Sequence, residues 1–207
     1  VMEAARAAEA EGRRIVHMEV GQPSTSAPYK ARQAVADALK ANPMGYTVAL
    51  GLPALRAGIA RLYLEWYGVD LDPGRVVITS GSSAGFLLAF TALFDADDKV
   101  GVATPGYPSY RQILKALSLQ PIDIPTQART GHKLRAEDVA EYSLDGLLVA
   151  SPANPTGTML DKGSLKALAD HAERLGIGFI SDEIYHGIEY DKKATTALEV
   201  TNRAYII

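Results

Sequence analysis

Most of the chain alternates between two hydrophobic patterns. From about Gly68 onward, short runs rich in β-branched residues alternate with longer stretches whose apolar positions recur at helical spacing. This alternation is typical of the α/β class, in which a mainly parallel sheet carries helices on both faces. We expect strands over residues 75–79, 100–103, 121–124, 147–150, 178–180 and 204–207, and helices over residues 83–94, 107–117, 136–142 and 162–175.

The beginning of the chain follows a different pattern. Asn42 and Pro43 interrupt it with a turn signal. Pro53 suits the first turn of a helix, and Gly68 suits a C-terminal cap. We therefore expect helices over residues 1–11, 28–40 and 53–67, and a short strand over residues 15–19.

Composition narrows the classes of function. The 207 residues are 47% hydrophobic, which allows a substantial core, and a net charge of −3 gives no broad positive field. We therefore expect neither nucleic acid nor a membrane as the main partner. The longest strongly apolar run, residues 85–94, is only about half of the roughly 20 residues that a membrane span requires. The lack of cysteine excludes disulfides and thiolate metal sites and leaves the cytoplasm as the expected compartment.

A turn of small residues precedes the helix expected at 83–94. It consists of Gly81, Ser82 and Ser83. Free backbone N–H groups and the positive end of the helix dipole favour phosphate at a helix N-terminus, and two serine hydroxyls would add donors. The plain alternative is a capped turn without a ligand.

The same turn is compatible with a different chemistry. Residues 81–85 match G-x-S-x-G, the nucleophile elbow of α/β-hydrolases, with Ser83 as the nucleophile. A hydrolase needs a histidine later in the chain, and of His132, His171 and His186 only His186 lies in a suitable segment. No segment of the HGGG type precedes the turn to form an oxyanion hole.

Two buried strands are expected to end in polar loops. Asn154 follows one of them, and Asp182 and Tyr185 follow the other. Such loops border the crevice in which open α/β sheets bind ligands. A carboxylate at the end of a buried strand is costly unless a cation or hydrogen-bond donors balance it, so we expect a partner for Asp182. We expect no metal, because no second ligand cluster supports a site built from Asp182, Glu183 and His186.

The chain carries four segments, in the order GSS, PGYPSY, NPTG and SDEIY, that resemble the class I/II aminotransferases, which are fold-type-I pyridoxal-phosphate enzymes. GQP at residues 21–23 resembles the family's substrate loop, and residues 45–56 resemble the start of its large domain. The resemblance implies that residues 1–43 begin a small domain and that residues 44–207 form an incomplete large domain. The closing AYII resembles the strand before the family's Schiff-base lysine, so we expect a fragment whose lysine lies beyond Ile207.

The resemblance also implies how the motifs would hold pyridoxal 5′-phosphate. The small-residue turn would bind the phosphate, and Tyr107 would stack on the pyridine ring. Asn154 and Tyr185 would bond the phenolic oxygen, with Asn154 also near the substrate. Asp182 would keep the ring nitrogen protonated, which makes the ring an electron sink. The implied cofactor-binding set is Tyr46, Gly81, Ser82, Ser83, Tyr107, Asn154, Asp182 and Tyr185, of which Asp182 and Tyr185 are also catalytic.

Two further residues extend the implied site. Tyr46 matches the position that reaches the phosphate of a neighbouring subunit, which implies a homodimer, and Gly21 would offer its backbone near the substrate carboxylate. We expect an aminotransferase acting on an amino acid and a 2-oxo acid, inactive in this fragment because the lysine is missing. The alternatives are another pyridoxal-phosphate enzyme (C–S lyase, decarboxylase or synthase), a hydrolase using Ser83, and the ligand-sensing domain of a transcriptional regulator.

Overall fold

The computed structural model describes residues 1–18, 21 and 25–207, which form two compact units, Val1–Thr47 and Val48–Ile207. The first unit contains α1 (Met2–Ala10) and α2 (Tyr29–Ala41). The strand expected at 15–19 does not form over residues 15–18, and Glu19 lies outside the described residues. In the described part of this unit no second strand is present to pair with this segment, so its apolar pattern does not produce a hydrogen-bonded ladder.

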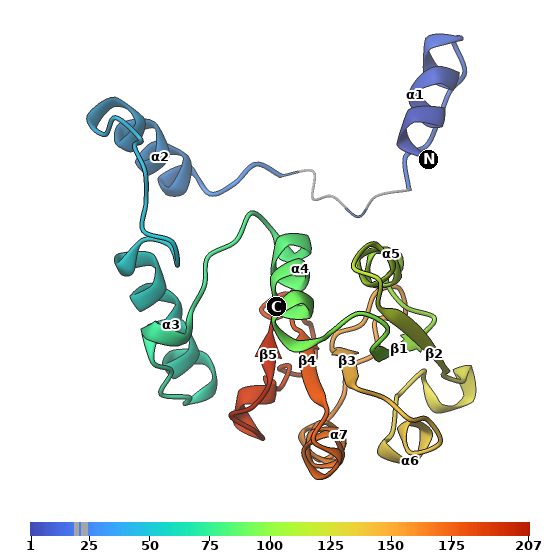
Figure 1. Ribbon diagram of the computed structural model, residues 1–207. Helices are drawn as coiled ribbons and strands as arrows, with labels where there is room; N and C mark the ends of the chain where they lie inside the picture. Colours follow the sequence, from blue (N-terminus) through green and yellow to red (C-terminus); the bar gives the residue numbers. More distant parts are fainter. Residues whose placement is uncertain (19–20, 22–24) are drawn as a thin grey trace. The chain divides into compact units, whose positions relative to one another are not determined.

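The second unit contains a five-stranded sheet in the order β2-β1-β3-β4-β5 (Figure 1). All neighbouring strands are parallel, which confirms the predicted fold class. Ala150 pairs with Asp182, so the carboxyl ends of β3 and β4 meet at one edge of the sheet. The strands are β1 (Lys99–Thr104), β2 (Gln120–Pro125), β3 (Gly146–Ala150), β4 (Gly178–Asp182) and β5 (Tyr205–Ile206).

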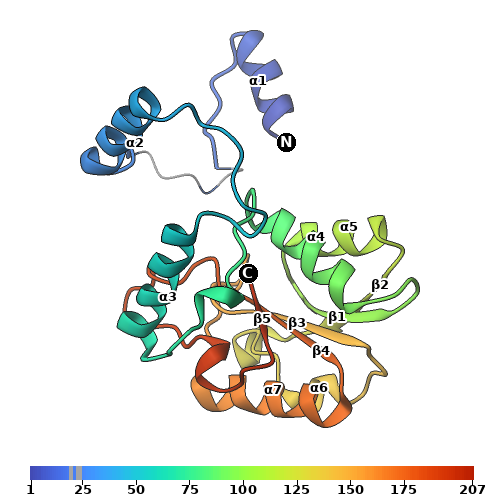
Figure 2. The same ribbon diagram turned by 60° about the vertical axis from the view of Figure 1, so that its left-hand side comes forward.

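The helices of the second unit are α3 (Pro53–Tyr67), α4 (Ser82–Leu93), α5 (Pro108–Ala116), α6 (Ala136–Val139) and α7 (Lys162–Leu175), with 3-10 turns η1 at Pro73–Arg75, η2 at Ala128–Thr130 and η3 at Ala197–Glu199. α4 and α5 lie on one face of the sheet, and α6 and α7 lie on the other (Figures 1 and 2). The predicted bounds of α3 and α7 are confirmed. Both helices end at a left-handed glycine, as expected of a C-terminal cap.

The central strand β3 divides the hydrophobic core. Leu147 packs with α7 residues on one face, and its neighbour Leu148 packs with Phe86 and Phe90 of α4 on the other. Successive side chains of a strand point to opposite faces, so a strand covered on both sides must be apolar at every position. The sequence GLLVA meets this requirement, which fixes the strand that leads to Asn154.

The prediction of a strand at 75–79 is wrong. Arg75 ends a 3-10 turn, and residues 76–79 form no strand. Ile78 N–H donates to Leu50 O at 3.0 Å, and Val76 O accepts from a side chain. These single bonds satisfy backbone groups that would otherwise need a neighbouring strand. Among the described residues, no strand of the sheet pairs with this segment.

Two other elements are shorter than expected. The helix predicted over 136–142 ends at Val139, and the strand predicted over 204–207 spans Tyr205–Ile206. After α6 the chain turns early, because Asp145 N–H bonds Lys99 O at 2.8 Å and brings the next residue into β3. No helix of the described chain is both long and apolar enough to cross a membrane.

Candidate functional site

The site is built around Asp182, the last residue of β4. Asp182 is only 5% exposed. The hydroxyl of Tyr110, on α5, donates to Asp182 Oδ2, and Ile184 N–H donates to Oδ1 at 3.2 Å. The carboxylate therefore has hydrogen-bond donors on both oxygens while lying inside the fold.

Burial governs the charge of this carboxylate. It raises the pKa of Asp182, and the hydrogen bonds from Tyr110 and Ile184 only partly oppose that rise. The pKa of Tyr110 is also raised, first by burial and then by the nearby Asp182 charge, so Tyr110 remains a hydrogen-bond donor. Within the described residues no ion pair reaches Asp182. The expected donors are therefore present, and a cationic partner would still stabilise the ionised form.

Aromatic rings lie beside this carboxylate. Tyr107, immediately before α5, meets the ring of Tyr110 edge to face, with centroids 5.4 Å apart. Tyr110 packs in the same way against Phe86 of α4, at 5.1 Å. Tyr110 and Phe86 are buried, whereas Tyr107 is only partly covered. Tyr107 thus presents part of an aromatic ring near Asp182, as a stacking role requires.

The small-residue turn lies at the start of α4. Gly81 has φ +88° and ψ 168°, a backbone conformation open essentially only to glycine. No side chain caps the first turn of this helix. The first N–H groups of α4, including those of Ser82 and Ser83, therefore have no side-chain acceptor and can face an anion. Gly81 and Ser83 are exposed, so such an anion can reach them.

The loop after β3 brings Asn154 to the turn after β4. Asn154 Nδ2 donates to the hydroxyl of Tyr185 at 3.4 Å. Two backbone bonds, Gly157 N to Ala153 O at 2.7 Å and Ala153 N to Thr158 O at 2.9 Å, close the loop around Asn154. A pocket at this edge of the sheet is lined by Asn154 together with Tyr110 and other residues. Asn154 and Tyr185 therefore present an amide and a phenol side by side.

Gly21 and Tyr46 belong to the first unit. Both are exposed, and Tyr46 is fully exposed. Tyr107, Asn154, Asp182 and Tyr185 all belong to the second unit, in which the carboxyl ends of β3 and β4 meet at one edge of the sheet. α4 covers the same face of the sheet as α5 (Figure 1). The geometry of the second unit does not include Gly21 or Tyr46.

Residues 13–207 match the model of one protein family, described as aminotransferase class I and II. The chain belongs to this family. The predicted resemblance and fold class are thereby confirmed, and class I and II aminotransferases depend on pyridoxal phosphate, the expected cofactor.

Relatives of this aminotransferase chain are found among curated proteins and among solved structures. Valine–pyruvate aminotransferase of Mycobacterium tuberculosis is 47% identical over 185 residues, which cover 88% of this chain and 48% of that protein. The crystal structure of an aminotransferase from M. tuberculosis superposes with a TM-score of 0.94 at 44% identity, over 99% of this chain and 54% of that one. The structure of aspartate aminotransferase from Thermus thermophilus with maleate superposes with a TM-score of 0.92 at 26% identity, over 98% of this chain and 54% of that one. The chain spans about half the length of the relatives it matches.

The arrangement of the aminotransferase chain argues against a hydrolase. Each histidine after Ser83 is engaged elsewhere: His132 Nδ1 lies 3.1 Å from Thr126 Oγ1, and His171 Nδ1 lies 3.1 Å from an arginine nitrogen. His186 contacts Tyr67 and the Ser151 carbonyl. No histidine of the described chain is bonded to Ser83, and no group of three or more metal-ligating side chains forms there.

Sequence reasoning missed two residues of this aminotransferase site. Tyr110 was not expected to bond Asp182, although it lies three residues after Tyr107 in PGYPSY and the two rings meet edge to face. His186 was considered as a hydrolase or metal residue, or as a solvated residue or one lying behind the site, and its contact with Ser151 was not expected. Ser151 lies 35 residues before His186, so the sequence around His186 gives no local sign of their contact.

Proposed function

We propose that the complete protein is a pyridoxal-phosphate-dependent aminotransferase that moves an amino group between an amino acid and a 2-oxo acid. The observation that carries this proposal is Asp182, a buried carboxylate with a raised pKa at the edge of the sheet where ligands bind. Family membership supports the cofactor, and relatives named for valine, pyruvate and aspartate support the substrate class.

The donor set of the second unit fits this cofactor. The uncapped start of α4 suits its phosphate, and the partly exposed ring of Tyr107 suits its pyridine face. Asn154 and Tyr185 supply two neighbouring polar groups for its phenolic oxygen. Asp182 suits its ring nitrogen, because a protonated nitrogen is the cation that this buried carboxylate lacks among the described residues.

Each side chain then has a defined task. Bound pyridoxal phosphate supplies an electron sink for negative charge developing on the substrate carbon. Asp182 holds a proton on the ring nitrogen, and its burial strengthens this interaction by excluding water. Tyr110 keeps Asp182 oriented through its hydroxyl. Tyr185, as a second catalytic residue, and Asn154 stabilise negative charge on the phenolic oxygen, and Asn154 also lies near the substrate.

We place the lysine that links the cofactor in the segment following Ile207. β5 runs parallel to β4, and Glu183 N–H donates to Ile207 O at 2.8 Å, so the chain leaves β5 at the edge that holds Asp182. On this proposal residues 1–207 alone do not turn over substrate, because the same lysine also moves the substrate proton.

The remaining assignments concern the whole protein. On this proposal residues 1–43 begin its small domain, and residues 44–207 form an incomplete large domain. Tyr46, being fully exposed, is free to reach the cofactor phosphate of a second subunit in a homodimer. Gly21 offers its backbone to the substrate carboxylate, and the protein works in the cytoplasm without nucleic acid or membrane as a partner.

Spectroscopy and assay of the complete protein test the proposal. It should show a visible absorption band of the bound cofactor that borohydride abolishes, and it should transfer an amino group from valine or aspartate to a 2-oxo acid. If the protein shows the cofactor band but releases carbon dioxide or a sulfur group from the amino acid and transfers no amino group, the decarboxylase or lyase alternative would be favoured. Absence of any cofactor band in the complete protein would overturn the assignment.

The substitution Asp182→Asn tests the role of the Asp182 charge most directly. It keeps the shape of the side chain but removes the charge, so cofactor should still bind while turnover falls by at least about a hundredfold, the scale of losing one preorganised electrostatic contact. Asp170→Asn, which changes an exposed aspartate paired with Lys166 on α7, is the matched control and should keep wild-type turnover. Equal rates in Asp182→Asn and wild type would contradict the role of Asp182.

A further inference from the structure

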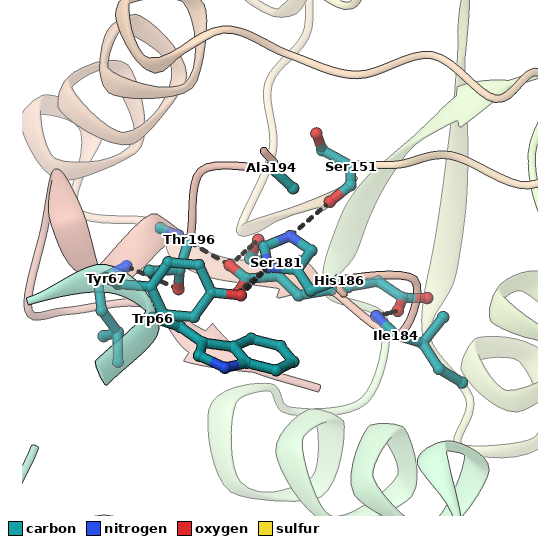
Figure 3. Close-up of polar contacts among 12 residues, drawn as sticks. Trp66, Tyr67, Ser151, Ser181, Ile184, His186, Ala194 and Thr196 are labelled. Carbon is teal, nitrogen blue, oxygen red and sulfur yellow. Dashed lines mark hydrogen bonds and ion pairs between the residues drawn. The ribbon is translucent and has the colours of Figure 1, made fainter. Parts of the chain in front are cut away.

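A buried histidine connects three distant parts of the second unit. His186 lies in the turn after β4, and its side chain is 7% exposed. Its Nε2 is 2.9 Å from the carbonyl oxygen of Ser151, and its Nδ1 is 2.7 Å from the hydroxyl of Tyr67 at the end of α3. Figure 3 shows the ring between these two groups. We call this chain of contacts the Tyr67–His186–Ser151 bridge.

The chemistry of the two neighbours fixes the tautomer of His186. A carbonyl oxygen can only accept, so the proton must be on Nε2. Burial and the negative charge of Glu183 raise the pKa of Tyr67 to about 12, so its hydroxyl stays protonated and donates to Nδ1. Both ring nitrogens are thus engaged, and the ring is held in one orientation from both sides. Glu183 Oε2 lies 3.6 Å from Nδ1 on the Tyr67 side of the ring.

Ser151 is the first residue of the loop that carries Asn154, and every polar group of Ser151 is bonded. Its N–H donates to Asp182 O at 3.1 Å, and its hydroxyl oxygen accepts from Leu160 N–H at 3.0 Å. His186 occupies the remaining acceptor, the carbonyl. The imidazole is therefore a side-chain link between the Asn154 loop and the turn that contains Tyr185.

The direct contact between these two segments is weak by comparison. Asn154 Nδ2 and Tyr185 Oη are 3.4 Å apart, beyond the usual range for an N–H···O bond, whereas the two bonds of His186 are short. A bond this long between two partly buried polar groups contributes little to holding the loop in place. The bridge is better suited to set the spacing of Asn154 and Tyr185.

We propose that His186 is a positioning residue: its imidazole, oriented by Tyr67, holds the Ser151 carbonyl so that the Asn154 amide and the Tyr185 hydroxyl both reach the cofactor's phenolic oxygen. This inference rests on the proposed function. The bridge does not touch the reacting atoms, and it acts through Asn154 and Tyr185. Hydrogen bonds from these two residues favour the ionised phenolic oxygen, so their misplacement should disfavour the deprotonated form of the bound cofactor.

Two substitutions of His186 in the complete protein distinguish the effect of its two polar contacts from the effect of its volume. In His186→Gln, the amide nitrogen can still donate to Ser151 and the amide oxygen can still accept from Tyr67, whereas His186→Leu removes both contacts. His171→Leu is the matched control, since it removes another buried histidine, on α7, whose Nε2 has no partner in the described structure. Circular dichroism and thermal unfolding establish that each variant is folded.

The first readout is the pH midpoint of the visible absorption change of the bound cofactor. His186→Leu should move the midpoint upward by about 0.3 pH unit or more, a roughly twofold or larger change in proton affinity. Its cofactor affinity should also fall, whereas His186→Gln and His171→Leu should keep midpoint and affinity near wild type. A folded His186→Leu protein with the wild-type midpoint would overturn the positioning role, because loss of packing alone does not move it.

The second readout needs no cofactor and separates this inference from the proposed function. Hydrogen exchange of residues 151–160 in the cofactor-free protein should accelerate in His186→Leu but not in His186→Gln or His171→Leu. If exchange is unchanged in His186→Leu, the bridge does not hold the loop and the inference fails even if the enzyme is an aminotransferase. If the wild-type protein binds no cofactor, the proposed function fails, and the positioning role fails with it even where the exchange prediction holds.

Discussion

Asp182 and Glu183 are adjacent acids that face opposite sides of the sheet. Asp182 meets Tyr110 on the α5 side, whereas Glu183 Oε1 accepts from Ser181 Oγ at 2.9 Å and from Ala197 N–H at 2.8 Å. Burial raises the pKa of both carboxyl groups. The two residues have different surroundings: Glu183 connects the start of η3 to the end of β4, while Asp182 lies at the carboxyl edge of the sheet beside Tyr110.

The raised pKa of Glu183 predicts a pH dependence of stability. A folded pKa above the unfolded value of about 4.3 lowers the free energy of unfolding as the pH rises from that value through the folded pKa. The variant Glu183→Gln has no carboxyl group at this position, so its free energy of unfolding does not fall for this reason as the pH rises. In urea unfolding of the cofactor-free protein, the stability of Glu183→Gln minus that of wild type should therefore increase with pH across this window and level off above it.

Glu189 gives a control of opposite sign. Backbone N–H groups, first that of Ala194, lower its pKa, so its contribution to stability is present above the unfolded value and is lost as the pH falls through the folded one. The difference between Glu189→Gln and wild type should therefore decrease as pH rises. If the two variants followed parallel pH profiles, burial would not be the dominant influence on Glu183.

Among the elements, α4 depends most on one backbone conformation. Gly81 at φ +88° starts the helix with its first N–H groups free, and no atom lies within 4 Å of where a β-carbon would stand. The obstacle to Gly81→Ala is therefore backbone strain alone, about 1–3 kcal/mol. If the chain relaxes to avoid it, the N–H groups turn away from the phosphate. We expect a lower melting temperature and at least about tenfold weaker cofactor binding by fluorescence titration.

Gly58→Ala is the matched control for this substitution. Gly58 lies inside α3, and its β-carbon would meet only the end of the Arg61 side chain at 3.7 Å. Alanine in a helix interior should stabilise the protein by about 0.5–1 kcal/mol and leave cofactor affinity unchanged. Wild-type affinity in Gly81→Ala would show that the start of α4 does not bind the phosphate.

The elements that could be predicted from sequence are those with a local signal. α7 was expected from its helical pattern and the glycine at its end, β3 was expected from its apolar run, and both occur where they were expected. Residues 75–79 are rich in β-branched residues, but a strand also needs a partner, and partners are not encoded locally. The site follows the same division. Asp182 was expected from its place at a strand end, whereas Tyr110 bonds it from 72 residues away.

At the scale of the whole molecule, the second unit carries Asp182 and the first unit carries the exposed Tyr46. If Tyr46 serves the partner's cofactor, each active site combines Asp182 of one subunit with Tyr46 of the other. Mixed dimers of Asp182→Asn and Tyr46→Ala then contain one site with both changes and one with neither. Coexpression should restore activity to about a quarter of wild type when subunits pair at random.

The controls for this experiment are the two parent homodimers, assayed at limiting cofactor. Each should be weaker than the mixture, because every one of their sites carries a substitution. Activity of the mixture equal to the mean of the two parents would mean that each subunit builds its site alone, and Tyr46 would then have no role across the interface.

If the proposed function is right, Asp182 keeps the cofactor's ring nitrogen protonated. Nitrogen-15 NMR of the complete protein, loaded with pyridoxal phosphate labelled at that nitrogen, measures the protonation state directly. We expect the chemical shift of a protonated nitrogen in the wild type and of an unprotonated nitrogen in Asp182→Asn. An unprotonated nitrogen in the wild type, or the same shift in both proteins, would contradict this role of Asp182.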